Sequence, residues 1–137
     1  MIDLLIIGGG PAGYVAAERA GKAGLKVVLF EKSAMGGVCL NEGCMPTKTL
    51  LYSAKMYENA LHGESYGVLG DNIRFDYSKM LSRKQKVVRK LVLGVEGSMK
   101  SNKVEVVKGA AHIDGRSSEG IEVTCNDEKY FGKSVLI

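Results

Sequence analysis

Two short apolar runs flank an alanine-rich segment at the start of the chain. Residues 3–7 form the first run, which ends in glycines, and residues 25–32 (LKVVLFEK) form the second. Continuous apolar runs of this length are typical of strands that a parallel sheet buries on both faces. Residues 12–23 between them have the composition of a packed helix. Because parallel strands need such a crossover, the pattern predicts a βαβ unit.

The middle of the chain has apolar residues at helical spacing. This spacing predicts a helix over residues 49–61 and a longer helix over residues 77–99, with a glycine-rich loop at 62–72 between them. Basic residues cluster at 82–94 within the second helix. We interpret this cluster as a solvated helix face and not as an RNA- or membrane-binding surface, since aromatic residues are missing from it.

The last third of the chain has the pattern of strands and tight turns. We expect strands at residues 104–113, 121–125 and 129–137, with turns at Asp114–Gly115 and Asn126–Asp127. The predicted fold is α/β and Rossmann-like, with a parallel sheet, crossover helices and an antiparallel β-meander. Because no turn or cap follows the final apolar run, we expect the domain to be truncated.

Composition agrees with one globular domain. The 137 residues are 45% hydrophobic and 25% charged, with a net charge of +4. No apolar run approaches the roughly 20 residues of a membrane span, and no basic leader precedes the first strand. We therefore expect a cytoplasmic protein that binds neither membrane nor nucleic acid.

The glycine-rich segment GGGPAG fits the pattern G-x-G-x-x-G through Gly8, Gly10 and Gly13. In this pattern the first glycine allows the turn, the second lets a diphosphate approach the backbone, and the third lets helix pack on strand. Glu31 ends the second strand at the position where a carboxylate accepts hydrogen bonds from ribose hydroxyls. The motif stands between a strand and a helix, as it must, and predicts a dinucleotide site. These residues leave the identity of the dinucleotide open.

A cysteine pair follows in the segment GGVCLNEGCMPTK. In one continuous helix the Cα atoms of Cys39 and Cys44 would lie about 8.6 Å apart, whereas a disulfide accepts at most about 6.8 Å. A bond therefore requires a distorted turn, which Gly43 and Pro46 allow. So small a ring contributes only about 1–2 kcal/mol and is easily reduced, which favours redox chemistry over a staple. Spacing alone leaves two unbonded cysteines as the alternative.

Other residues of possible chemical interest have simpler interpretations. No further ligands stand near the cysteine pair, so we predict no metal site. His62 and His112 are single and far apart in the sequence, and we expect each to be a surface or structural residue. Cys125 has no companion and is expected to be a small buried side chain.

Together the segments GGGPAGYVAA, LFEK and GGVCLNEGCMPTKTLLYSAK resemble the flavin-dependent pyridine nucleotide–disulfide oxidoreductases. The resemblance covers the whole chain as the N-terminal portion of an FAD-binding domain, residues 1–137. It implies that the NAD-binding and dimerisation domains, with a His–Glu acid/base pair, lie outside this chain. The CLN and TKTLLYSAK stretches favour the branch that oxidises dihydrolipoamide, with NAD as final acceptor.

The resemblance also implies roles for individual residues. Cys39 would be the thiol that exchanges with the substrate, Cys44 the thiolate that faces the flavin, and Lys48 a cation at the flavin's reactive edge. The backbone around Ala111 would contact adenine. The FAD contacts that it implies are Gly8, Gly10, Gly13, Glu31, Lys32, Gly36, Gly37, Val38, Cys39, Lys48 and Ala111.

The same resemblance implies partners and leaves alternative functions open. The partners would be lipoyl domains of 2-oxo acid dehydrogenase or glycine cleavage complexes, and the full-length protein would be a homodimer. Thr47 stands where relatives often have Ser, and Ala111 where they often have Gly. The alternatives are a relative that reduces another disulfide or mercuric ion, and a nucleotide-binding module without catalysis. We expect this chain alone to lack turnover.

Overall fold

The computed structural model describes residues 1–137 and is built around a six-stranded sheet with the strand order β3-β2-β1-β6-β5-β4. The strands are β1 (Ile2–Ile7), β2 (Val27–Glu31), β3 (Glu105–Lys108), β4 (Ala111–Ser117), β5 (Gly120–Cys125) and β6 (Glu128–Leu136). The helices are α1 (Pro11–Lys22), α2 (Gly37–Asn41), α3 (Cys44–Leu61) and α4 (Tyr77–Ser101), with a 3₁₀ turn, η1 (Gly63–Tyr66). This is the mixed α/β fold that the sequence predicts.

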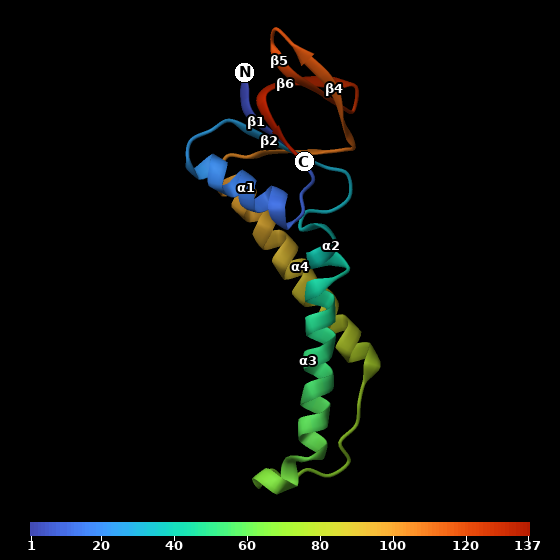
Figure 1. Ribbon diagram of the computed structural model, residues 1–137. Helices are drawn as coiled ribbons and strands as arrows, with labels where there is room; N and C mark the ends of the chain where they lie inside the picture. Colours follow the sequence, from blue (N-terminus) through green and yellow to red (C-terminus); the bar gives the residue numbers. More distant parts are fainter.

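The parallel half of the sheet is centred on β1. This strand pairs in parallel with β2 on one side and with β6 on the other, and β2 in turn pairs with β3. Helices α1 and α4 cover one face of this half (Figure 1). The apolar core between them contains Ile6, Ala17, Val27, Leu29, Met35, Met99 and Val104. The predicted βαβ opening is confirmed.

The antiparallel half curls over the opposite face of the sheet. Leu5, Val28 and Phe30 project to that face and form a second core with Val123 and Cys125 of β5. The Phe30 ring meets Tyr130 of β6 edge to face, with centroids 5.0 Å apart. Cys125 is therefore buried, as predicted.

One of the two predicted turns is correct. Asn126 and Asp127 have φ values of 51° and 62°, which is the backbone of a tight hairpin turn between β5 and β6. The turn predicted at Asp114–Gly115 is wrong. Strand β4 continues through these residues with a bulge, and Gly115 (φ 146°) absorbs the irregularity.

The predicted strand 104–113 is also divided in two. It breaks at Gly109–Ala110, because β3 pairs with β2 whereas β4 pairs with β5. These two short strands lie at opposite edges of the sheet. The residues between them therefore cross the sheet's end.

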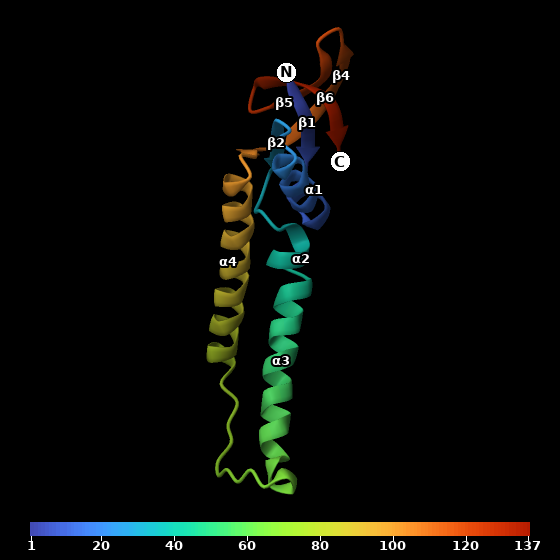
Figure 2. The same ribbon diagram turned by 90° about the vertical axis from the view of Figure 1, so that its left-hand side faces the viewer.

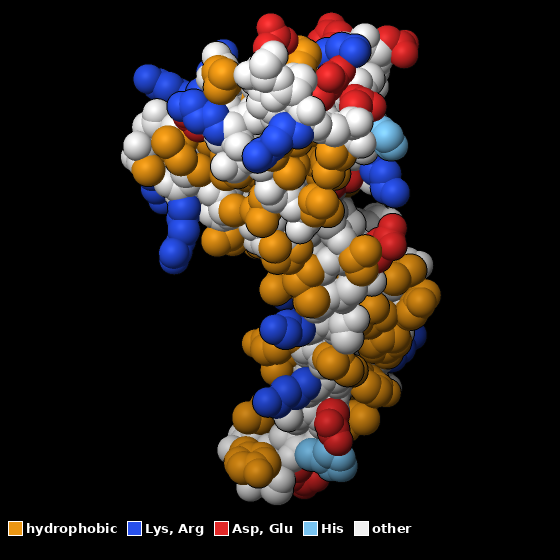
Figure 3. Space-filling view, turned by 45° about the horizontal axis from the view of Figure 1, so that its top comes forward, with side chains coloured by type: hydrophobic (Ala, Val, Ile, Leu, Met, Phe, Trp, Pro, Cys, Tyr) orange, Lys and Arg blue, Asp and Glu red, His pale blue; other side chains and the backbone are white.

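Helices α3 and α4 form a hairpin arm that extends away from the sheet (Figure 2). Asp76 caps α4 by accepting a hydrogen bond from the Lys79 amide at 3.0 Å. Apolar side chains are exposed along the arm (Figure 3), among them Leu51, Tyr52, Leu61, Tyr66 and Leu93. None of the helices combines the length and apolar character needed to cross a bilayer.

The Asp3 carboxylate links β1 to β6 and to the residue before β2, and should make stability depend on pH. It accepts hydrogen bonds from Lys133 Nζ at 2.6 Å and from the Lys26 amide at 2.9 Å. The Lys133 hydrogen bond, assisted by that from Lys26, lowers the pKa of Asp3 below its usual 3.8. A lowered carboxyl pKa adds stability above about pH 4, and this contribution disappears as pH falls through the folded-state value.

We therefore expect Asp3→Asn to lower Tm by about 1–3 °C at pH 7. The difference from the unsubstituted chain should be smaller at pH 2 than at pH 7, because protonation of Asp3 progressively removes the carboxylate that Lys133 stabilises. Thermal unfolding followed by circular dichroism at both pH values measures this. Asp71→Asn, in an exposed loop, is the matched control and should leave Tm unchanged. An equal difference at pH 2 would contradict the assignment.

Candidate functional site

The turn between β1 and α1 is built from glycines that bring strand and helix into close contact. Gly8 has a φ of +109° and donates its N–H to the Phe30 carbonyl at 2.8 Å. A Cβ on Gly13 would overlap the carbonyl oxygen of Gly8. Around Gly10, in contrast, no atom lies within 4 Å of the place that a Cβ would take. Backbone there is open to a ligand, next to the free N–H groups of the helix terminus.

Two adjoining cavities flank this turn. One, of about 240 Å³, is lined by Gly8, Gly10 and Gly13 at the start of α1. The other, of about 250 Å³, is lined by Glu31, Lys32 and the residues Gly109, Ala110 and Ala111. Both share Ile7 and Gly8.

The Glu31 carboxylate lies at the mouth between β2 and the glycine turn. Its Oε2 accepts a hydrogen bond from the Gly9 amide and its Oε1 accepts one from the Ser33 amide, each at 2.7 Å. Each carboxylate oxygen has a further lone pair. Glu31 can therefore accept ribose hydroxyls while the backbone holds it in place. Lys32, beside it, is exposed.

The two cysteines belong to two separate helices. Cys39 lies in α2, and Cys44 is the first residue of α3. Between them the chain turns at Gly43, whose φ and ψ are −113° and −103° and whose N–H donates to the Val38 carbonyl at 2.7 Å. This break is the distorted turn that a bond between the sulfurs requires.

Both thiols are free in this structure, with Cys39 half-buried and Cys44 exposed. The Cys44 side chain is in hydrogen-bonding contact with Cys39 and, with partial burial, raises the pKa of the Cys39 thiol above its usual 9.0. The positive charge of Lys48 acts in the opposite direction but more weakly.

The cysteine segment and the glycine turn contact each other through backbone. The Gly36 amide donates to the Gly9 carbonyl at 2.8 Å. A Cβ on Gly37 would lie 2.8 Å from the Cα of Gly10. Gly36 and Gly37 have φ values of 96° and 60°, so this close approach depends on both being glycine. The structure thereby joins the predicted dinucleotide site to the predicted thiol pair.

Two residues that sequence reasoning missed hold this junction together. Gly9 uses its N–H for Glu31 and its carbonyl for Gly36. Asn41 donates its side-chain amide to the carbonyls of Met35 and Gly37, at 3.1 and 2.9 Å, and so braces α2. The run of three consecutive glycines, of which Gly9 is the middle one, was the available signal for this residue. Nothing in the sequence distinguishes Asn41.

The predicted site residues thus form two adjoining groups. Around the two cavities lie Gly8, Gly10, Gly13, Glu31, Lys32 and Ala111. On the cysteine segment lie Gly36, Gly37, Val38, Cys39, Cys44 and Lys48. Val38 and Lys48 point into neither cavity and are exposed. His62 and His112 are both at the surface, as predicted.

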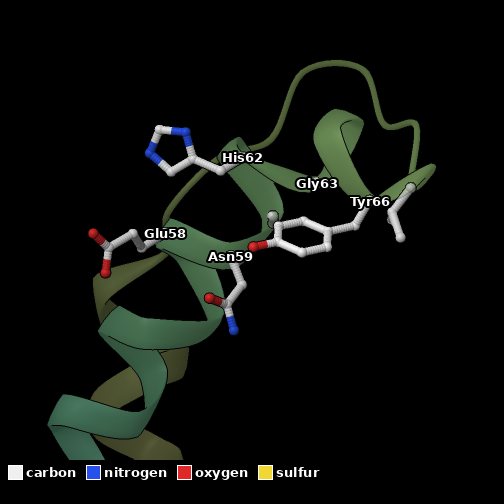
Figure 4. Close-up of a pocket in the computed structure, with 7 residues that line it drawn as sticks. Glu58, Asn59, His62, Gly63 and Tyr66 are labelled. Atoms are coloured by element: carbon white, nitrogen blue, oxygen red, sulfur yellow. The ribbon is translucent and has the colours of Figure 1, made fainter.

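The largest cavity, of about 660 Å³, lies elsewhere, at the far end of the arm (Figure 4). The Tyr66 ring extends toward Asn59 there, and His62 points away from both (Figure 4). Tyr66 is 85% exposed and Val68 64% exposed, so little of this space is enclosed. The whole of α3 separates it from Cys44. The junction at the glycine turn, and not this hollow, is the candidate site.

Known proteins match this chain over nearly its whole length. The family described as "Pyridine nucleotide-disulphide oxidoreductase" matches residues 2–137. Dihydrolipoyl dehydrogenases of Geobacillus stearothermophilus and Bacillus subtilis are 49% and 44% identical over 98% of this chain. The chain spans 29% of the length of each of these relatives.

A solved structure supports the same relationship. The HOCl-induced flavoprotein disulfide reductase RclA of Escherichia coli, determined as a Cu(II) complex, aligns with 97% of this chain. The TM-score is 0.75 and the identity 27%, and the alignment covers 26% of that protein. With a glycine turn and a cysteine pair held in contact, and with these matches along its whole length, the chain belongs to the pyridine nucleotide–disulphide oxidoreductase family.

Proposed function

We propose that residues 1–137 form the N-terminal portion of the FAD-binding domain of an NAD-dependent dihydrolipoyl dehydrogenase. The hydrogen bond from Gly36 to Gly9, at 2.8 Å, is the observation that carries this proposal. It fixes a thiol pair beside a cradle for a dinucleotide, which is the arrangement that electron transfer between the two requires. The relatives at 42–49% identity, all named dihydrolipoyl dehydrogenase, support the choice of substrate.

The cradle would hold FAD through two sets of groups. Gly8, Gly10 and Gly13 would receive the diphosphate at the start of α1, and Glu31 with Lys32 would bind the adenosine ribose. Backbone at Ala111 would contact adenine. Gly36, Gly37, Val38 and Lys48 would face the flavin. When bound, FAD supplies a two-electron acceptor that passes hydride to NAD, whose site would lie outside these residues.

The chain's own chemistry would begin with the oxidised pair, Cys39 bonded to Cys44. A dihydrolipoyl thiolate attacks Cys39 Sγ, and the bond to Cys44 breaks. The substrate sulfur is now bonded to Cys39, and Cys44 leaves with the electron pair as a thiolate. Exposure of the cysteine segment, where Val38 is 69% exposed, leaves room for a protein-borne substrate.

A second exchange would complete the oxidation. The other substrate thiol loses its proton to a base and attacks the substrate sulfur of the mixed disulfide, so that lipoamide forms and Cys39 departs. Two electrons have moved from the substrate to the cysteine pair. The raised pKa of Cys39 means that Cys39 takes up a proton as it leaves. Cys44 then remains as the sulfur that donates to the flavin.

The whole protein would have the partners of its relatives. Its substrate would be carried on lipoyl domains of a 2-oxo acid dehydrogenase or glycine cleavage complex, and it would act as a homodimer. The base that deprotonates the substrate would come from residues beyond 1–137. We propose accordingly that the chain alone does not turn over.

One observation favours a second candidate, a flavoprotein that reduces a different disulfide. The solved structure that aligns over 97% of this chain is a flavoprotein disulfide reductase. The 27% identity to it is lower than the identity to the dihydrolipoyl dehydrogenases. Of the two candidate substrates we therefore favour dihydrolipoamide.

Visible spectroscopy of the chain with FAD tests the roles of the two sulfurs. After two-electron reduction with dithiothreitol we expect a long-wavelength absorption band from a thiolate in contact with the flavin. Cys39→Ser should retain the band and Cys44→Ser should abolish it, because Cys44 is the donor. The third thiol, Cys125, stays in place in both variants and rules out a general thiol effect. A chain that binds no FAD, or a band that survives Cys44→Ser, would contradict the proposal.

In the full-length protein, loss of either sulfur should stop disulfide exchange. We expect Cys39→Ser and Cys44→Ser each to lower the rate of dihydrolipoamide oxidation by at least about a thousandfold. Initial rates of NADH formation measure this. Full activity in Cys39→Ser would refute the role assigned to that thiol.

Replacing Gly13 or Gly10 of the turn with alanine should separate an effect on folding stability from an effect on FAD affinity. Gly13→Ala forces a methyl group against the Gly8 carbonyl and should cost about 1–3 kcal/mol in urea unfolding. Gly10→Ala meets no atom and should change stability by less than about 1 kcal/mol. Its methyl group would nevertheless fill space needed by the diphosphate, so FAD affinity should fall at least about tenfold. Unchanged FAD quenching in Gly10→Ala would contradict the cradle.

A further inference from the structure

We propose that Asn126, in the turn between β5 and β6, is a positioning residue for the adenine side of the nucleotide cradle. The inference rests on the proposed function, because it concerns the cavity that we assign to the adenosine of FAD. It concerns a residue that lines neither cavity. Asn126 acts through the crossover between β3 and β4, residues 109–110 and the ends of the flanking strands.

The crossover forms one wall of the adenosine cavity. Gly109, Ala110 and Ala111 line it opposite Glu31 and Lys32. Because β3 and β4 lie at opposite edges of the sheet, Gly109 and Ala110 run across its end outside any ladder, and Ala111 begins β4. The Gly109 amide donates to the Glu31 carbonyl at 3.1 Å, which holds one side of the crossover.

Asn126 holds the other side of the crossover. Its Nδ2 donates to the Lys108 carbonyl at 2.9 Å, across 18 positions of the chain. Its Oδ1 lies 2.5 Å from the place that a Cβ on Gly109 would take, and Cys125 Sγ lies 2.6 Å from the same place. Any larger residue at 109 would collide with both. Hydrogen bonds to the Glu31 carbonyl and from the Asn126 amide therefore hold this wall on both sides.

Both the backbone and the side chain of position 126 explain why asparagine stands there. The residue has a φ of 51°, a left-handed conformation that Asn, Asp and Gly adopt most readily. Only asparagine among these three also has a donor for the Lys108 carbonyl. Glycine would keep the turn without the bond, and aspartate would place acceptor against acceptor. The turn alone does not require the amide.

The neighbouring Asp127 provides a matched control. It has nearly the same backbone, with a φ of 62°, and belongs to the same turn. Lys108 receives its side-chain hydrogen bond from Asn126 and not from Asp127. A change at 127 therefore perturbs the hairpin without releasing the crossover.

The experiment is calorimetric titration of the chain with ADP and with FAD. We expect Asn126→Gly to weaken both affinities about five- to tenfold, the effect of one lost hydrogen bond, and Asn126→Asp to weaken them further. Asp127→Gly should stay within about twofold of the unsubstituted chain. Hydrogen exchange of the Gly109 amide should accelerate in Asn126→Gly but not in Asp127→Gly. If Asn126 only stabilised the turn, Asn126→Gly and Asp127→Gly would change the nucleotide affinities and the exchange of the Gly109 amide to a similar extent.

The outcomes separate this inference from the proposed function. If the unsubstituted chain binds neither ADP nor FAD, the cradle and the inference both fail. If it binds both and the Asn126 variants bind equally well, only the inference is overturned. Asn126→Asp has nearly the volume of the original side chain and tolerates the turn, so it gives a result even if Asn126→Gly unfolds.

Discussion

The contact between α1 and β1 is the constraint on which the rest of the structure depends. Because Gly13 has no side chain, the helix reaches the Gly8 carbonyl and begins directly at the end of the central strand. The free N–H groups at the start of α1 then face the carboxyl end of the strands, where β2 also ends. A side chain at Gly13 would push the helix away and separate the groups that surround both cavities.

The same turn positions the cysteine segment through a single residue. Gly9 donates to the Glu31 carboxylate and accepts from the Gly36 amide, so one residue connects the end of β2 to the start of α2. Asn41 then fixes α2 by binding the Gly37 carbonyl. The start of α2 is therefore held by the backbone bond from Gly36 to Gly9 and by the uncharged amide of Asn41.

Much of this arrangement could be predicted from the sequence, and the failures have identifiable causes. Elements β1, α1 and β2 lie within two residues of their predicted bounds, because apolar runs and the glycine motif are strong local signals. Helix α2 was missed since its five residues are too few to show a periodic pattern. Asp114–Gly115 looks locally like a turn, yet pairing with β5 carries the strand through it.

The candidate site shows the same division. Its residues could be named individually, since each belongs to a motif with a known chemical requirement. The contact between these residues could not be predicted from the sequence. The hydrogen bond between Gly9 and Gly36 joins two loops, and the distance between the loops depends on the packing of Met35 and the helices behind it. The role of Asn126 is also invisible in sequence, where Asn–Asp indicates only a hairpin turn.

The strand order has a consequence for how the chain folds during synthesis. Strand β1 is made before the other five strands of this sheet, but its second neighbour, β6, is made after them, and the pair formed by Asp3 and Lys133 spans 130 positions. Until β6 emerges, one edge of the most apolar strand has no partner and can pair with other chains. Closure of the sheet centre is thus a late, long-range event, and the nascent protein passes through a stage in which it is prone to aggregate.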